Sequence, residues 1–201
     1  MSRFGIGSKP APRIAIELSG SGHHPAAAIG TAADSDVWVE VTEPAEAALI
    51  RIQAADLRAA QQQTARIKSA AAVAGRDPAG ISVLVDIEVI IAADAPGARQ
   101  RMARLDEMLD IPWVPRSIHY VGTPTGLAGL IADIHAVHVA DGVTLLPLEL
   151  PEVLGHIAFE TLPWLESIGV RMAREQVEYV RRRGLRQCAT DLHTAGERRS
   201  A

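Results

Sequence analysis

Apolar and polar positions along the chain follow two alternating periods, which predicts strands separated by helices. Short runs rich in Ile, Val and Leu, with apolar residues on one or both faces, are typical of strands. Such runs occupy residues 13–18, 36–41, 81–91 and 142–146. The run at 81–91 is apolar at nearly every position, which indicates a parallel strand that is buried on both faces.

Longer segments carry apolar residues three or four positions apart and predict helices between these strands. The longest is expected to begin at Thr42-Glu43-Pro44, where a Thr cap precedes an acid and a Pro, and to end near Ala74 before Gly75. The other helices are predicted at about 25–33, 95–109, 125–137 and 151–168.

A strand followed by a helix, four times over, predicts an α/β fold with parallel strands and right-handed crossovers. Four such βα units in residues 1–170 amount to half of an eight-unit barrel, or to a small open sheet. An irregular link is expected between Pro112 and Pro115. Residues 171–201 are rich in Arg with acidic residues interleaved, and are expected to form a helical or disordered tail that is exposed to solvent.

Composition and charge exclude several classes of protein. The 201 residues are 48% hydrophobic, enough for one packed core, and a net charge of −4 gives no general attraction to nucleic acid or anionic membranes. The single cysteine, Cys188, excludes an internal disulfide framework and a cysteine-rich zinc site. No stretch reaches about 18 uncharged apolar residues and the N-terminus lacks the shape of a signal peptide, so the expected location is the cytoplasm.

Four segments, taken in order, resemble parts of the luciferase-like flavin-dependent monooxygenases. Residues 13–39, a strand followed by Ser-Gly-Ser-Gly, an Ala-rich helix and Ser-Asp-Val-Trp-Val, resemble the fifth and sixth strands of that family. Ala-Gly-Arg-Asp-Pro at 74–78, with the long strand after it, is similar to the segment of the seventh strand. The segments 120–124 and 140–147 resemble the run into the eighth strand, and Leu-Pro-Trp-Leu at 162–165 resembles a motif in the last helix.

The resemblance implies a partial (β/α) TIM barrel that corresponds to strands five to eight of the family. It further implies an oxidoreductase that uses FMN, or a related deazaflavin, to oxidise a small organic substrate with O₂. The first four strands are missing, so the chain is expected to be a truncated or split monooxygenase that is completed by a second chain carrying the N-terminal half-barrel.

A non-catalytic scaffold is the main alternative to a flavin enzyme. A half-barrel leaves two strand edges unpaired, and two copies could associate through these edges as a homodimer without flavin. A chain without a stable fold is a third, weaker alternative, since half a barrel core is marginal by itself.

The candidate cofactor-binding residues are Ser19, Gly20, Ser21 and Gly22, between a strand and a helix. Glycine lets the backbone approach a ligand, and free amides at a helix N-terminus bind phosphate. The resemblance implies that this loop contacts the FMN phosphate, although its order of Ser and Gly departs from that of the family. The structural alternative is a plain tight turn.

Other polar residues carry weaker signals. The adjacent His23 and His24 make a poor metal site without a third ligand, and are expected to be exposed in the loop or to hydrogen-bond a phosphate. His119 is considered for substrate gating, and Trp113 is expected to pack rather than to stack on flavin. Four acids inside strand runs are expected to face water or a partner in an incomplete barrel, namely Glu17, Glu40, Asp86 and Glu88. No catalytic residue and no metal ligand is assigned.

Overall fold

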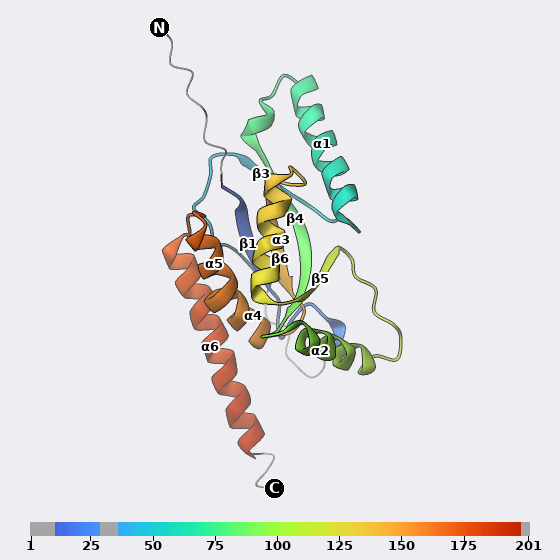
Figure 1. Cartoon of the computed structure of the whole chain (residues 1–201), viewed down its shortest axis with the longest axis vertical. Coiled ribbons are helices and arrows are strands. Elements are labelled where there is room, and N and C mark those ends of the chain that lie inside the picture. The colour runs from blue at the N-terminus through green and yellow to red at the C-terminus, as the bar shows by residue number, and fades with distance from the viewer. Residues whose placement is uncertain (1–10, 29–35, 198–201) are drawn as a thin grey trace.

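The computed structural model describes residues 11–28 and 36–197, which form a six-stranded sheet with helices around it (Figure 1). The strands are β1 (Arg13–Leu18), β2 (Val37–Glu40), β3 (Ala48–Ile52), β4 (Ile81–Ile91), β5 (Ile118–Gly122) and β6 (Gly142–Pro147). All eleven residues of β4 are buried, as the apolar run at 81–91 predicts. The strand predictions at 13–18 and 142–146 are also confirmed.

The order of the strands is β2-β1-β6-β4-β3, and β5 pairs with β4 as well. β3 pairs with residues 81–85 of β4 and β5 pairs with residues 87–91, while β6 pairs with residues 84–89 on the other side. β3 and β5 therefore form one edge of β4 that is interrupted at Asp86. Ser117 lies at this interruption, where its hydroxyl donates to the Asp86 carbonyl at 2.6 Å.

This order corrects the prediction of four consecutive βα units. Consecutive barrel strands would pair in chain order, but the first strand here, β1, pairs in parallel with the last, β6. First and last strands are the pair that closes a complete barrel. β2 is also not part of a parallel unit, because it runs antiparallel to β1 and covers its outer edge.

The helices follow the strands with recognisable caps. The main helices are α1 (Leu57–Val73), α2 (Ala95–Glu107), α3 (Pro124–Ala136), α4 (Glu152–His156), α5 (Leu162–Ser167) and α6 (Arg174–Glu197), with one π turn at Ile157–Thr161 between α4 and α5. Asp94 and Thr123 cap α2 and α3 by accepting the N–H groups of Gly97 at 2.7 Å and Gly126 at 3.1 Å. Both starts agree with the sequence prediction. α6 follows the tail prediction in being helical, but its first turns join the core through Val177 and Val180.

The predicted start of the longest helix is wrong. The helix expected from Thr42 begins only after Asp56, whose carboxylate accepts the N–H of Ala59 at 2.7 Å. Thr42 instead accepts the N–H of Ile14 at 3.1 Å, and strand β3 follows it. β5 was not predicted at all. Of the helix expected at 25–33, a single 3₁₀ turn spans Pro25–Ala28, and residues 29–35 lie outside the described residues.

The sheet has two chemically different faces, which we call the outer and inner faces. Alternate residues along each strand point to opposite faces, and residues paired across parallel strands share a face. The outer face is aliphatic and includes Ile14, Ile16, Val83, Val85, Ile87, Val89, Val143 and Leu145, all fully buried. α3 contacts β5 and β6, and α4 contacts β4 (Figure 1). Polar side chains gather on the inner face, among them Arg13, Glu17, Glu40, Arg51, Asp86, Glu88, His119 and Thr144.

The sheet is strongly curved toward the inner face. Arg51 on β3 contacts Glu17 on β1, although β4 and β6 lie between these two strands. In a flat sheet, three strand spacings separate two such backbones by about 14 Å, which the two side chains would hardly bridge. The sheet therefore has the curvature of a barrel wall, with its charged face on the concave side. No helix within 11–28 and 36–197 is long and apolar enough to cross a membrane.

Candidate functional site

An ion-pair network occupies the inner face. Arg51 contacts Glu17 through Nη1 and Asp86 through Nε, the latter at 2.5 Å, and Gln53 donates to the second Asp86 oxygen at 3.3 Å. The side chain of Asp86 is fully buried. Burial raises the pKa of Asp86 although the hydrogen bond and charge of Arg51 oppose the shift. Burial acts to lower the pKa of Arg51, but its two carboxylate partners outweigh this effect and raise it.

A second pair joins β1 to β2 beside this network. Arg13 holds Glu40 in a bidentate pair at 2.6 and 2.9 Å, and its Nη1 donates to the carbonyl of Ala47 at 3.2 Å. Ala47 precedes β3, so Arg13, like Arg51, links the two ends of the curved sheet. The expectation that the strand acids face water or a partner is wrong for Glu17, Glu40 and Asp86, because arginines of the same chain neutralise them.

A different group of side chains lies in the half of the sheet toward the carboxyl ends of β1 and β4. We call His24, Glu88, Trp113 and His119 the rim cluster. The ring of Trp113 lies between the two imidazoles, with centroids 4.9 Å from His24 and 5.4 Å from His119. Glu88 and His119 are register partners on β4 and β5. Helix α2 covers this end, since it contacts β4, β5 and the turn at 25–28.

Three polar atoms of the rim cluster are buried and have no hydrogen-bond partner among the described residues. They are Nε2 of His24, Nε2 of His119 and one oxygen of Glu88. Burial raises the pKa of Glu88, and burial also lowers the pKa of His119. Such atoms are costly, at about 1–3 kcal/mol each, so their concentration at one place indicates a position for polar ligand atoms or water.

The histidine expectation is wrong for His24. It is fully buried, and its Nδ1 accepts the N–H of Ala26 at 3.2 Å, while Nε2 lies 3.5 Å from a carboxylate oxygen of Asp106. His23 directs Nε2 to the carbonyl of Glu17 at 3.0 Å. Trp113 packs as expected. The rim cluster as a group was missed because its members are scattered over four segments, and nothing in the sequence indicates that they meet.

The predicted phosphate loop forms the turn after β1. Gly20 and Gly22 have φ angles of 43° and 135°, which favour glycine. The N–H groups of Gly22, His23 and His24 already donate to carbonyls, those of Ser19 at 2.7 Å, Pro147 at 2.9 Å and Leu148 at 3.0 Å respectively. A Cβ at Gly22 would lie 2.3 Å from the Leu148 carbonyl oxygen, so this glycine permits close packing of two loops.

Other parts of the loop remain accessible. Nothing lies within 4 Å of the Cβ position of Gly20, and Ser19 and Ser21 are half-buried. The residues that follow form a 3₁₀ turn at Pro25–Ala28, and the rest of the helix that the sequence predicted lies outside the described residues. Phosphate binding at residues 19–22 stays a prediction, now resting on the two hydroxyls rather than on a row of free amides.

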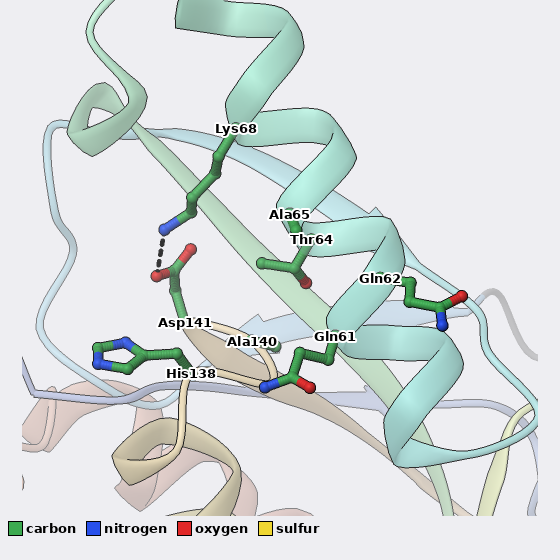
Figure 2. Close-up of a pocket in the computed structure, with 8 residues that line it drawn as sticks. All are labelled: Gln61, Gln62, Thr64, Ala65, Lys68, His138, Ala140 and Asp141. Atoms are coloured by element: carbon green, nitrogen blue, oxygen red, sulfur yellow. Dashed lines mark hydrogen bonds and ion pairs between the residues drawn. The ribbon is translucent and has the colours of Figure 1, made fainter.

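The opposite, amino-terminal end of the sheet carries a separate cavity of about 500 Å³ between α1 and the segment that leads into β6 (Figure 2). Lys68 and Asp141 meet across it with a distance of 2.6 Å. In barrel enzymes, catalytic residues lie at the carboxyl ends of the strands, so this cavity is not the counterpart of their active site. Within the described part of the chain, no group of three His, Cys, Asp or Glu residues is arranged to hold a metal ion.

Solved structures of luciferase-like monooxygenases share this fold over about three fifths of the chain. Riboflavin lyase (RcaE), solved with modified FMN and riboflavin, aligns with a TM-score of 0.54 at 19% identity, covering 61% of this chain and 39% of that one. EDTA monooxygenase (EmoA) from Chelativorans sp. BNC1 aligns with a TM-score of 0.52 at 17% identity, covering 61% and 42%. Long-chain alkane monooxygenase (LadA) aligns with a TM-score of 0.52 at 15% identity, covering 61% and 37%.

These likenesses establish the fold as a partial luciferase-like barrel. The chain spans about two fifths of the length of the structures it matches. No family model matches the sequence, and no curated protein does.

Proposed function

We propose that the chain is a flavin-binding, oxidoreductase-like protein built on a reduced luciferase-like barrel. The observation that carries the proposal is the rim cluster, where a buried oxygen of Glu88 and the buried Nε2 of His119 lack hydrogen-bond partners in the half of the sheet toward the carboxyl end of β4. Barrel enzymes bind their ligands at this end of the sheet. Riboflavin lyase, which shares the fold, was solved with a modified FMN, and FMN is therefore the flavin that we propose first.

The residues at the rim fit a flavin with one restriction. The phosphate would meet the hydroxyls of Ser19 and Ser21 and the open space above Gly20, because the amides of residues 22–24 are engaged. The ring system would meet the partly exposed ring of Trp113, which packs against His119. When bound, a flavin supplies the redox chemistry, and the protein binds it, orients it and limits the access of water. The phosphate would therefore be held by side-chain hydroxyls in a shallow site, and not by a row of backbone N–H groups.

In this proposal β1 takes the place of the first strand of a barrel and β6 that of the last, because the two pair in parallel. β2 then occupies the edge of β1 at which the next barrel strand would pair, and the ion pairs of the inner face lie beside it. This assignment differs from the correspondence with strands five to eight that the resemblance implies.

A non-catalytic scaffold is the second candidate, and a specific observation supports it. Arg13 and Arg51 occupy the inner face and pair with three of its acids, Glu40, Glu17 and Asp86, so these charged groups serve structure there. The scaffold would associate through its remaining strand edges as a homodimer, with a second copy in place of the missing half.

Titration of the purified chain with FMN, followed by quenching of flavin fluorescence, distinguishes the two candidates. We expect saturable binding of FMN, at least about tenfold tighter than that of riboflavin, which corresponds to roughly 1.4 kcal/mol from the phosphate. The double variant Ser19→Ala/Ser21→Ala should remove this preference, whereas Ser167→Ala, on the surface of α5, should not.

Absence of quenching at about 100 μM FMN, a concentration that would saturate a micromolar site, overturns the flavin proposal. A colourless protein with twice the 21.4 kDa mass of the chain in light scattering would then support the scaffold. Retained preference for FMN in the double variant would show that the phosphate binds elsewhere.

A further inference from the structure

The segment between α2 and β5, residues 110–116, is held to the rest of the molecule mainly by one side chain. We call these residues the rim loop; Figure 1 shows them as a long arch between the two elements. Every residue of the rim loop is exposed except Trp113, which is half-buried and packs against the core. Residues 110–115 form no hydrogen bond within the described chain. Release of the Trp113 ring would therefore free most of the loop.

The composition of the rim loop adds little to its attachment. Ile111 and Val114 are 77% and 73% exposed, so their apolar side chains contribute almost no burial. Pro112 and Pro115 flank Trp113 and fix the backbone φ on both sides of it, which restricts the loop to few conformations. The loop is therefore a stiff flap with a single aromatic anchor, and such weakly attached segments are where proteins open locally.

The anchor rests on two ionisable rings. Trp113 lies between His24 and His119, tilted by 59° to the first imidazole and nearly perpendicular, at 88°, to the second. Histidine is the side chain whose charge ordinarily changes between pH 5 and 8. The contact that holds the rim loop is thus made by groups that respond to pH in this range.

The two imidazoles differ in how readily they can take up a proton. Nδ1 of His24 accepts the N–H of Ala26 at 3.2 Å, so the neutral ring carries its proton on Nε2, and a second proton would break this hydrogen bond. Nε2 of His119 has no hydrogen-bond partner among the described residues, so no bond has to be broken at this atom. His119 is therefore the ring that we expect to become charged.

The surroundings of His119 disfavour its charge while the loop is closed. Burial lowers the pKa of His119; the charge of Asp106 on α2 opposes this shift, and the neighbouring His24 adds to it. Glu88 is the register partner of His119 on β4, and one of its oxygens accepts the N–H of Arg116 at 3.2 Å. Burial raises the pKa of Glu88, so on acidification this acid loses its compensating charge earlier than an exposed glutamate does.

We propose that the rim loop is a pH-operated lid, closed while His119 is neutral and released with Trp113 when His119 takes up a proton. The open state exposes the imidazole to water and therefore binds the proton more tightly than the closed state. As the pH falls below the ordinary histidine pKa of 6.5, one proton can shift the opening equilibrium by up to about tenfold per unit of pH. The inference concerns the chain alone and does not rest on the proposed flavin.

Trp113 can report its own release. The chain has three tryptophans, and the background variant Trp38→Phe/Trp164→Phe leaves Trp113 as the only one. Acrylamide quenching of its fluorescence measures how exposed the ring is. We expect the quenching constant to rise at least about twofold between pH 7.5 and pH 5, with a red shift of the emission. Far-UV circular dichroism should stay unchanged over this range, because only the loop opens.

His119→Phe, made in the same background, tests the proton acceptor. Phenylalanine keeps an aromatic ring against Trp113 and cannot be protonated, so quenching at pH 5 should stay at its level at pH 7.5. His156→Phe is the matched control. His156 pairs with Glu160 at 2.6 Å on the segment of α4 and the π turn, and its replacement should leave the pH response of Trp113 intact.

Asp106→Asn tests the direction of the charge effect and decides the question if His119→Phe does not fold. Asp106 is partly exposed on α2, and its negative charge favours the charged form of His119. Loss of this charge should move the midpoint of the quenching transition to lower pH. A midpoint that stays in place or rises overturns the proposal.

Three further results would overturn the lid. The first is quenching that is flat or falls toward pH 5; a fall is what a cation–π contact between charged His119 and Trp113 would produce. The second is a pH response that persists in His119→Phe. The third is a loss of circular dichroism together with the quenching transition, which would mean that the whole chain unfolds. All measurements are made without FMN, so their outcome is separate from that of the flavin titration.

Discussion

The two faces of the central sheet solve the same packing problem with different chemistry. The outer face buries aliphatic side chains such as Ile87 and Leu145 against helices, as any barrel wall does. The inner face holds charged side chains, among them Arg51, which reaches across two strands to the carboxylate of Glu17. The comparison teaches that the outer face depends on burial alone, whereas the inner face depends on charged groups whose removal leaves another charge buried.

The largest effect is expected for Arg51→Met on the inner face. Asp86 is fully buried, and loss of its arginine leaves a carboxylate without compensation, which costs about 3–5 kcal/mol of unfolding free energy. Urea unfolding at neutral pH measures the loss. Arg101→Met removes a partly exposed pair with Glu149 and should cost less than about 1 kcal/mol. Equal losses of unfolding free energy in the two variants would show that burial on the inner face does not make an ion pair more costly to break.

Leu145→Ala tests the outer face by creating a cavity. Leu145 is fully buried on β6, and replacement of such a residue costs about 2–5 kcal/mol. The urea midpoint should fall with little change in the slope of the transition, and the loss should be the same at pH 5 and pH 7.5 because no charge is involved. A strong dependence on pH would show that the aliphatic face is coupled to the ionisable one.

The sequence predicts an element correctly where residues within that element determine its conformation. It fails where contacts with distant segments determine the conformation. The apolar run of β4, the caps at Asp94 and Thr123 and the glycine at Gly75 are local signals, and the structure has them as predicted. β3 was missed because Thr42-Glu43-Pro44 has the composition of a helix start, whereas Thr42 is held by the backbone of Ile14 in another strand.

The candidate site was less accessible to sequence reasoning for the same reason. The turn at Ser19–Gly22 lies where the pattern placed it, but the next two residues, His23 and His24, donate to the carbonyls of Pro147 and Leu148, about 125 positions away in the sequence. The strand acids were identified, and the arginines that neutralise them were not, because pairing across a curved sheet depends on strand order. β1 pairs with β6, which is distant in the sequence, and no local pattern indicates this pairing.

Glu88→Gln sharpens the comparison at the edge of the inner face. Burial raises the pKa of Glu88 above its ordinary 4.5, so the folded chain holds a proton that the unfolded chain releases, and wild type loses stability as the pH rises through the folded pKa. The amide has no charge to bury, and should be more stable than wild type by on the order of 1 kcal/mol at pH 7.5. Urea unfolding from pH 4 to 8 should show this advantage disappear toward pH 4.

Glu107→Gln, at the exposed end of α2, serves as the control and should leave the pH profile unchanged. An advantage of Glu88→Gln that is constant over this pH range would contradict a role for the buried charge.

Asp94→Ala gives the smallest of these effects and involves neither face. The carboxylate of Asp94 caps α2 by accepting the N–H of Gly97, and its loss should cost about 1 kcal/mol in thermal or urea unfolding. Asp94→Asn preserves an acceptor and should change stability by only a few tenths of a kcal/mol. A larger loss in the Asn variant would assign the effect to charge rather than to the cap.

A double-mutant cycle between Arg51 and Glu17 tests most directly whether ion pairs link the two ends of the curved sheet. The cycle uses Arg51→Met, Glu17→Gln and the double variant, with unfolding free energies from urea titrations at low salt. We predict a coupling energy of at least about 1 kcal/mol between these residues of β3 and β1, against less than about 0.5 kcal/mol for the same cycle on Arg101 and Glu149. A coupling energy for Arg51 and Glu17 that is indistinguishable from zero would contradict the account.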